Sequence, residues 1–349
     1  ITGGMPYGNK TLHFGHIGGV FVFADVYARS LRDRIGDDNV IFVSGTDCYG
    51  SPIAESYRKL CAEGKFEGTI HDFVEMNHKA QKKTLDDYMI SLNIFGASGL
   101  GRTAEIHDDV SDKFIRRLYE NGHLRKISTK QFYDEKAGCF LNGRQVIGKC
   151  PVDGCNSEKG YADECDLGHQ YMPESLIDPK STLTGETPVM RDVDNWYFDL
   201  PAYNALLKEY TAKISKMKNV RPLVSSTISE FLCDPVIHIK NELLDKYEAV
   251  KAQLPEHEFS EEKKKPSFTI GFKTLDEMNE ACAVLSANGI RYRTGKTLVP
   301  FRLTGNIEWG VKAPVLEGED PLTVWVWPES LWAPISFTKA VLEQQGKDM

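Results

Sequence analysis

The sequence lacks the marks of a membrane or secreted protein, and it has no excess of positive charge. No stretch approaches the 18 apolar residues of a membrane-spanning helix. No basic segment followed by an apolar one opens the chain, so no secretory signal is indicated and a cytoplasmic location is expected. The formal net charge of −8 disfavours wholesale binding of nucleic acid, which requires clustered cations. Lys79, Lys82 and Lys83 could form a local basic face, although a solvated helix face is the simpler interpretation.

Eight cysteines would allow four disulfides, but a chain expected in a reducing compartment makes that interpretation poor. Cys150, Cys155 and Cys165 lie within residues 150–165, a crowding that indicates metal. Soft thiolates in two short loops, joined by the imidazole of His169, suit a closed tetrahedral Zn²⁺ site. With no open position such a site is structural. The alternative is a knuckle that has lost its metal and keeps buried thiols.

The first fifty residues have the pattern of a βαβ unit. Residues 1–4 run into a turn-rich loop, residues 14–35 show a helical pattern that ends at Gly36, and residues 39–44 form an apolar run typical of a buried strand. This unit predicts a parallel sheet whose ligands bind at the carboxyl ends of its strands. Residues 52–125 are predicted to be mostly helical.

The later patterns are less regular. Residues 126–200 have the short strands and turns of an inserted module, and residues 199–218 and 242–254 are predicted to be helical. A charged linker at 261–266 precedes a predicted strand (268–272), helix (275–288) and strand (290–292), which together resemble a compact βαβ insert. Residues 322–327 are predicted to form a strand that returns to the main sheet. The sequence contains no internal repeat and no low-complexity tract.

His13-Phe14-Gly15-His16 stands where the first strand gives way to its helix. A helix N-terminus offers unpaired N–H groups and the positive end of its dipole to a phosphate group. Gly15 would let an adenine or ribose approach the backbone closely. His13 and His16, three residues apart, share one face of the first turn and can donate hydrogen bonds to charge on an α-phosphate. The alternative, two incidental histidines, is weakened by the preceding strand and by Pro6 and Asn9.

Residues 1–16, with Met5-Pro6-Tyr7-Gly8-Asn9 at their centre, resemble the opening of class I aminoacyl-tRNA synthetases, most closely methionyl-tRNA synthetases. The resemblance implies that this loop forms the floor of an amino-acid pocket. Tyr7 would pack on the substrate side chain, and the backbone of Met5 would face the amino acid. The implied ATP site comprises Asn9, His13, Gly15 and His16.

A second motif follows the predicted strand. A carboxylate at the carboxyl end of a parallel strand is well placed to pair with an ammonium group, and Gly45-Thr46-Asp47-Cys48-Tyr49-Gly50 resembles the family's G-T-D-E-H-G. The resemblance implies that Asp47 holds the α-amino group of the substrate; an aspartate that caps the next turn is the alternative. Cys48 and Tyr49 replace the usual Glu and His, which bears on specificity.

The third part of the resemblance is Trp325, within residues 323–327, which is similar to the family's Y-V-W-x-D-A-P. The resemblance implies that this tryptophan lines a methionine pocket, where contacts between a ring and a thioether are favourable; a core tryptophan is the alternative. Residues 327–332 interrupt the expected D-A-P-I-G-Y, so the pocket wall is rebuilt. Residues 306–311 resemble the end of R-D-L-D-W-G-I, with Gly305 at the usual arginine position.

The family also carries a zinc knuckle, and the flanks at 160–165 and 176–181 agree, although the first cysteine pair here has four residues between its members and the set ends in His169. The implied fold is α/β: a Rossmann-like parallel sheet with an inserted zinc-knuckle connective-peptide domain and an extra small α/β insert. The implied domains are 1–125 (first half of the catalytic domain), 126–219 (connective peptide), 220–302 (extra insert, helical then α/β) and 303–349 (return to the catalytic domain). The resemblance covers residues 1 to about 205 and 303 to about 340.

The implied function is an ATP-dependent, AMP-forming ligase that activates an amino acid, expected to be methionine, with ATP and Mg²⁺ and transfers it to tRNA. No protein nucleophile is needed, because positioning and charge stabilisation drive attack by the carboxylate. The alternatives are a paralogue that activates another amino acid for a different acceptor and a non-catalytic relative that binds RNA or protein. No K-M-S-K-S loop or anticodon-binding domain precedes Met349, so we expect part of a longer protein, inactive alone, rather than a minimal paralogue.

Overall fold

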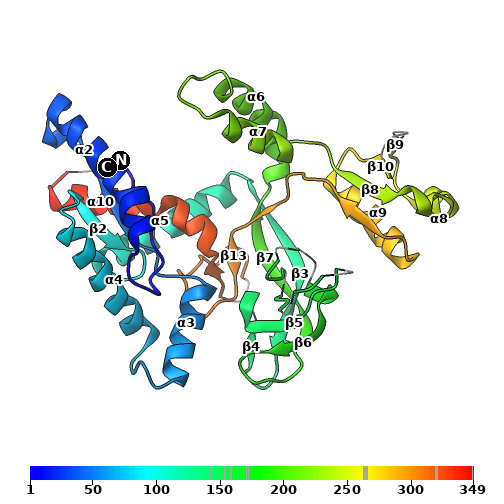
Figure 1. The fold of residues 1–349 in the computed structure, drawn as a ribbon, viewed down its shortest axis with the longest axis horizontal. Coiled ribbons are helices and arrows are strands. Elements are labelled where there is room, and N and C mark those ends of the chain that lie inside the picture. The colour runs from blue at the N-terminus through cyan, green and yellow to red at the C-terminus, as the bar shows by residue number, and fades with distance from the viewer. Residues whose placement is uncertain are drawn as a thin grey trace. The chain divides into compact units, whose positions relative to one another are not determined.

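The computed structural model describes residues 1–349 except residues 142, 153–154, 158, 163, 168, 170, 172, 262–265, 319–320 and 348. The chain forms two compact units: Ile1–Tyr197 with Arg302–Met349, and Phe198–Phe301 (Figure 1). Within the described residues, no helix has both the length and the apolar character needed to cross a bilayer.

The first unit contains a short parallel sheet. Strand β1 (Val43–Thr46) pairs in parallel with β2 (Ile94–Ala97), and the N-terminal segment lies along the other edge of β1 through parallel bridges from Thr2 to Val43 and from Tyr7 to Asp47. The predicted helix over residues 14–35 and its end at Gly36, where φ is +90°, are confirmed. The helices of this part are α1 (Phe14–His16), a π-helical turn (Ile17–Phe21), α2 (Val22–Ile35), α3 (Ser51–Ala62), α4 (Ile70–Asp87) and α5 (Gly101–Glu120).

The strand predictions need correction in three places. Strand β1 begins at Val43 rather than at residue 39, and residues 52–125 include β2, which has too little apolar bulk to stand out from the helices beside it. The prediction of a strand over 322–327 that returns to the main sheet is wrong: β14 (Thr323–Val324) pairs with β13 (Thr304–Gly305) and bridges to Lys312, and α10 (Val326–Gln344) begins at once. Pro328 fits the first turn of that helix because the turn needs no N–H donor there.

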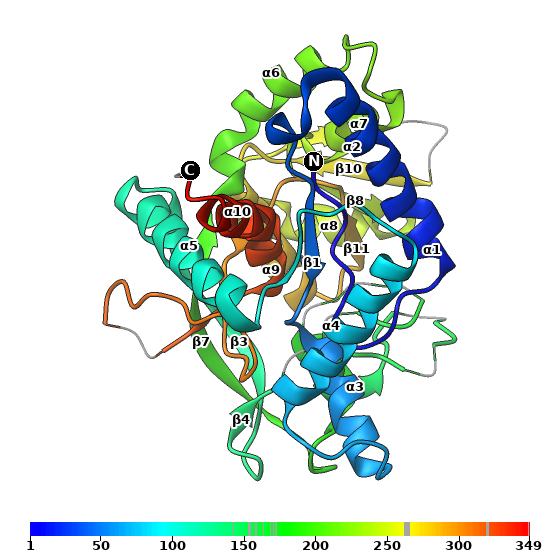
Figure 2. The same ribbon diagram turned by 90° about the vertical axis from the view of Figure 1, so that its left-hand side faces the viewer.

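Helix α10 packs on the parallel sheet and along α5 (Figure 2). Its buried residues recur as neighbouring pairs every four residues, the period of one helix face: 328–329, 332–333, 336–337 and 340–341. The Phe337 ring lies on Gly45 and Gly96, which face each other in the β1–β2 register. A Cβ atom would approach the ring to 2.5 Å at Gly45 and to 2.7 Å at Gly96, so both positions require glycine for this contact.

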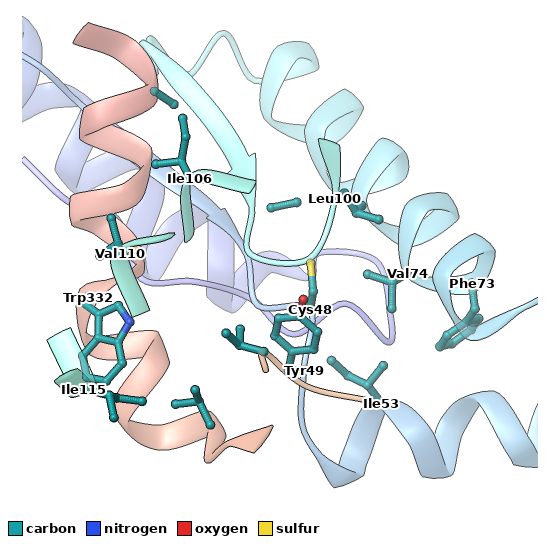
Figure 3. Close-up of a cluster of buried hydrophobic side chains, with 14 residues drawn as sticks. Cys48, Tyr49, Ile53, Phe73, Val74, Leu100, Ile106, Val110, Ile115 and Trp332 are labelled. Carbon is teal, nitrogen blue, oxygen red and sulfur yellow. The ribbon is translucent and has the colours of Figure 1, made fainter. Parts of the chain in front are cut away.

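The core of the first unit is an apolar cluster between α3, α4, α5 and α10 (Figure 3). Cys48 and Tyr49, the two departures from the family motif, lie in this cluster with Ile53 and Val74. Trp309 fixes the pair, since its indole N–H donates to the Cys48 carbonyl at 2.5 Å and its ring lies 5.2 Å from that of Tyr49. These two substitutions are therefore core residues.

The segment between α5 and the second unit is strand-rich, as expected. It contributes β7, β3 and β4 to a sheet in the order β12-β7-β3-β4, whose edge strand β12 comes from later in the chain, and it contains the antiparallel pair β5–β6 around a small core that includes Phe132, Leu141 and Val146. The strands are β3 (Leu124–Asp134), β4 (Cys139–Phe140), β5 (Val146–Lys149), β6 (Ile177–Ser181), β7 (Val189–Phe198) and β12 (Phe301–Arg302).

The second unit contains a helical hairpin and a four-stranded sheet. The sheet has the order β11-β8-β10-β9 with the pairs β11–β8, β8–β10 and β10–β9 antiparallel, which is the βαββαβ arrangement of ferredoxin-like folds. The predicted helices and the strand at 268–272 are confirmed, but the partner of β10 is β8, which lies between β10 and β11. The elements are α6 (Asn204–Ile214), α7 (Pro222–Phe231), β8 (Val236–Lys240), α8 (Leu244–Val250), β9 (Glu258–Ser260), β10 (Ser267–Gly271), α9 (Leu275–Ala287) and β11 (Tyr292–Thr294).

Candidate active site

The loop of residues 5–10 is tied to the end of β1 by its backbone. The Asp47 N–H donates to the Pro6 carbonyl at 2.9 Å, and the Gly8 N–H donates to the Asp47 carbonyl at 2.8 Å. These two bonds bring Tyr7 and Asp47, both predicted to bind the substrate, to adjacent positions at the carboxyl end of the sheet. The Tyr7 side chain is 39% exposed, whereas that of Asp47 is buried.

Gln81 of α4 holds the same loop in place, a role that no sequence motif indicates. Its Nε2 donates to the carbonyls of Tyr7 and Lys10, each at 2.8 Å, and its Oε1 accepts from the Thr46 hydroxyl at 2.7 Å. The Gln81 side chain is fully buried, so water could not easily replace its hydrogen bonds to the loop if the side chain were removed.

Glu329 is the main site residue that sequence reasoning missed. It lies in α10 with no exposed surface, and its Oε1 has no hydrogen-bond partner among the described residues. Burial and then the charge of Glu329 raise the pKa of Asp47 to about 8. Burial likewise raises the pKa of Glu329 to about 8, with a further contribution from Asp108. The pKa of Tyr7 is raised by burial and then by the charges of Asp47 and Glu329, so these three groups share one electrostatic environment.

His107 of α5 holds the other oxygen of Glu329. Its Nε2 lies 2.7 Å from Glu329 Oε2 and its Nδ1 lies 2.9 Å from the Ser336 hydroxyl, and all three side chains are fully buried. Burial lowers the pKa of His107 to about 4, so the imidazole is neutral near pH 7. A neutral imidazole can donate to an ionised Glu329 while accepting from Ser336, or the reverse when Glu329 is protonated. The chain of bonds thus accommodates either state of the carboxyl group.

His13 and His16 lie together at the start of α1, as expected, with ring centroids 3.9 Å apart. His13 Nδ1 accepts from the Gly15 N–H at 3.1 Å, and His16 Nδ1 accepts from the His13 N–H at 3.2 Å. The prediction that the helix N-terminus presents unpaired N–H groups is therefore wrong for these two. Because each Nδ1 is an acceptor, the neutral rings carry their protons on Nε2 and retain one donor each. Burial, then the charges of His13 and Lys10, lowers the pKa of His16.

The remaining predicted residues have various surroundings. Gly15 leaves room for the His13 ring, since a Cβ there would lie 2.9 Å from that ring. Asn9 donates to the Ser56 hydroxyl at 3.2 Å, and its buried Oδ1 has no partner among the described residues. Met5 packs on the core beneath α10, which includes Phe337.

Trp325 lies at the N-terminus of α10. The backbone N–H of Trp325 donates to the Leu303 carbonyl at 2.8 Å, and the Arg302 guanidinium lies 4.4 Å from the centre of the indole ring. The contacts described for Trp325 are thus with residues 302–305 and with α10. The next residue, Val326, approaches Gly50 at the end of the Asp47 motif.

The cysteine cluster forms as predicted. The ligand atoms of Cys150, Cys155, Cys165 and His169 all lie within 4.8 Å of one another. Cys155 Sγ is 3.9 Å from Cys165 Sγ, and His169 Nδ1 is 3.3 Å from Cys155 Sγ and 3.4 Å from Cys165 Sγ. Tetrahedral zinc bonds of about 2.3 Å to sulfur and about 2.0 Å to nitrogen would separate two sulfurs by about 3.8 Å and sulfur from nitrogen by about 3.5 Å. The donor set and its spacing therefore fit zinc, and the eight cysteines are all free thiols.

Comparisons with known proteins identify relatives of the chain. The methionine–tRNA ligase of Cytophaga hutchinsonii is 37% identical over 211 residues, which are 60% of this chain and 29% of that protein. The methionine–tRNA ligase of Christiangramia forsetii is 30% identical over 352 residues, which cover 100% of this chain and 39% of that protein. The chain thus spans well under half the length of these relatives.

A crystal structure of a LeuRS–tRNA–LeuAMS ternary complex from Agrobacterium radiobacter has the same fold, with a TM-score of 0.52 at 12% identity over 98% of this chain and 56% of that chain. The family model described as "tRNA synthetases class I (M)" matches residues 1–243. That match covers more than half of the sequence and includes both the Tyr7 loop and the cysteine cluster. The chain therefore belongs to the class I (M) tRNA synthetases, and its fold is of the α/β class I synthetase type.

Proposed function

We propose that this protein activates methionine with Mg²⁺-bound ATP to form methionyl adenylate and passes the methionyl group to tRNA. The observation that carries the proposal is the pair of buried carboxyl groups, Asp47 and Glu329, beside Tyr7. No Lys or Arg among the described residues forms an ion pair with either. A buried pair of acids without a cation is a poor structural feature but a good receptor for the α-ammonium group of an amino acid.

The other predicted site residues would bind ATP and the rest of the amino acid. His13 and His16, which each retain an Nε2–H donor, would donate to the α-phosphate as negative charge builds on it. Asn9 and Gly15 would border the nucleotide, and the backbone of Met5 would face the amino acid. Tyr7 and Trp325 would contact the substrate side chain. The choice of methionine is supported by the relatives, which are methionine–tRNA ligases. Mg²⁺ would be carried by the nucleotide.

We also propose that Cys150, Cys155, Cys165 and His169 hold a structural Zn²⁺ ion. The ion would join the two loops that carry these ligands, and it would take no part in the reaction. The full architecture proposed is a Rossmann-like domain of residues 1–125 and 303–349 with the connective peptide (126–219) and an extra α/β insert (220–302) between its halves.

The proposal is tested by equilibrium binding to the chain itself. Isothermal titration calorimetry with a panel of the 20 amino acids, with and without a non-hydrolysable ATP analogue, should give heat with methionine and at least about tenfold weaker binding of the others. Asp47→Asn and Glu329→Gln should each weaken methionine binding by at least about tenfold, while Asp245→Asn, at an exposed position of α8 in the second unit, should leave it unchanged. Binding of none of the amino acids, or tightest binding of one other than methionine, would contradict the proposal.

A further inference from the structure

The hairpin of α6 and α7 concentrates positive charge in an otherwise acidic chain. Residues 210–229 contain no Asp or Glu, yet they include Lys213, Lys216, Lys218 and Arg221, whereas the whole chain has a net charge of −8. All four cations are exposed. The ion pairs described for the hairpin involve other residues, Lys208 with Asp234 and Glu230 with Lys296.

Helix α4 gives the opposite arrangement and serves as a reference. Lys79, Lys82 and Lys83 each lie within 2.9 Å of a carboxylate four residues away along the helix. These lysines are neutralised locally, so the local basic face that the sequence allowed at α4 is a solvated helix face. In the hairpin only Lys213 has a carboxylate four residues away, that of Glu209, and no ion pair among the described residues joins them. Lys216, Lys218 and Arg221 have no acidic residue at that spacing, so the field of these cations extends into solvent.

The surface beside these cations has the chemistry of a nucleic-acid contact. Leu206, Tyr210 and Lys213 recur at helical spacing along α6 and are exposed, and the exposed Met217 follows just beyond the end of that helix. The Tyr210 side chain is 55% exposed, which leaves its ring open to stack on a base.

A cleft of about 660 Å³ lies between the two helices and is lined by several hydroxyl groups together with the ion pair of Lys208 and Asp234. Each hydroxyl donates to a backbone carbonyl three or four residues before it, so its oxygen retains acceptor capacity, which a ribose 2′-OH can use as a donor. The hydroxyls belong to Thr211, Ser215, Ser225, Ser226 and Ser229.

We propose that the α6–α7 hairpin binds the sugar–phosphate backbone of tRNA. Lys213, Lys216, Lys218 and Arg221 contact phosphates, Tyr210 stacks on an unpaired base, and the cleft hydroxyls accept from ribose. The proposal rests on the proposed function, in which tRNA is the substrate, and it assigns the α6–α7 hairpin as a surface that contacts the tRNA. Phosphate contacts of this kind contribute affinity and a dependence on salt.

The experiment compares two triple variants of the chain with the same loss of charge. Lys213→Gln/Lys216→Gln/Lys218→Gln removes the unpaired cations, and Lys79→Gln/Lys82→Gln/Lys83→Gln removes the paired ones. Fluorescence anisotropy with a labelled transcript of a methionine-accepting tRNA gives Kd between 50 and 200 mM salt. The hairpin variant should bind at least about tenfold more weakly at 50 mM salt, with a salt slope smaller by about one for each lost contact, and the α4 variant should stay within about twofold of the parent.

Two further arms separate the possible failures. Tyr210→Ala should weaken tRNA binding without changing the salt slope, and a DNA of the same sequence should bind more weakly than the RNA. Circular dichroism and methionine calorimetry check that each variant is folded and that its amino-acid site is intact. Equal tRNA affinity for the two triple variants would overturn the proposal. An absence of tRNA binding by the parent would also overturn it, whereas an absence of methionine binding alone would count only against the proposed activation reaction.

Discussion

Two acids in one buried place carry an electrostatic cost unless a cation joins them or one keeps its proton. In the free protein the pair of Asp47 and Glu329 keeps a proton near neutral pH, because burial raises the pKa of each to about 8. An ammonium group changes the balance, since it stabilises both ionised forms. Binding of an amino acid near pH 6 or 7 must therefore release a proton from the site, and affinity must depend on pH.

We expect the affinity for methionine to rise from pH 6 to pH 8, by up to about tenfold per pH unit for each proton released. Calorimetry in buffers of different ionisation enthalpy measures both Kd and the number of protons. Glu329→Gln should flatten the dependence and weaken binding, because the amide neither titrates nor pairs with the ammonium. Affinity that is constant across this range in the parent chain would show that the carboxyl groups are not the ammonium receptor.

The same groups show what could be predicted for single residues. Asp47 and Tyr7 belong to short motifs, so their roles and their proximity to strand ends could be proposed from local sequence. Glu329 could not, because its partner His107 lies 222 residues away along the chain. A helix predicted over residues 326–344 would have placed Glu329 on the buried face, and a charged residue on that face would have indicated a functional role. The mutual capping of His13 and His16 likewise depends on ring orientations that no spacing reveals.

Among the elements, α10 and the parallel sheet meet most tightly where the Phe337 ring lies on Gly45 and Gly96. Gly96→Ala should destabilise the chain by about 1–3 kcal/mol, since its methyl group would lie 2.7 Å from the Phe337 ring. Urea denaturation measures the free energy of unfolding. Gly19→Ala, at a helical position with nothing within 4 Å of the added methyl, should be neutral or stabilising by up to about 1 kcal/mol. If the ring is the cause, the cost of Gly96→Ala should fall in a Phe337→Ala background; an unchanged cost would assign it to the backbone.

The cysteine module should contain one equivalent of zinc. Metal analysis of the purified, dialysed chain by mass spectrometry measures it, and Cys155→Ser should reduce the zinc content well below one equivalent. Cys233→Ser, at an exposed thiol in the second unit, provides the matched control and should leave it unchanged. Removal of zinc by a chelator should lower the melting temperature, because the ion joins two loops that few apolar contacts hold. A metal-free, equally stable parent would support the alternative of buried thiols without metal.

The elements show why parts of the fold escaped prediction. The long amphipathic helices and the cysteine loops have strong local patterns, and both were found. Strand β2 and the pairing of β8 with β10 and β11 depend on contacts between distant segments, which hydrophobic period alone does not specify. Alternating Val and Trp at 324–327 favoured a strand, but Pro328 and the buried period that follows decide for a helix.

In the whole molecule, the unit at Phe198–Phe301 has a core of its own. Ile237, Ile239, Tyr247 and Phe268 are buried with the inner faces of α8 and α9, and every member of this cluster lies between residues 237 and 292. Such a closed set of contacts gives the unit cohesion that does not depend on the parallel sheet or on α10. Its unfolding should therefore be separable from that of the first unit.

We expect two thermal transitions by differential scanning calorimetry, each assignable by one core substitution. Ile239→Ala should lower the melting temperature of the second unit and reduce its free energy of unfolding by about 2–5 kcal/mol, because removal of the fully buried side chain leaves a cavity in the core of that unit. Ile239→Ala should leave the Kd for methionine within about twofold. Phe337→Leu should lower the melting temperature of the other transition, that of the first unit. Added methionine should raise the melting temperature of the first unit alone. A single transition shifted equally by both substitutions would mean that the two units unfold as one cooperative body.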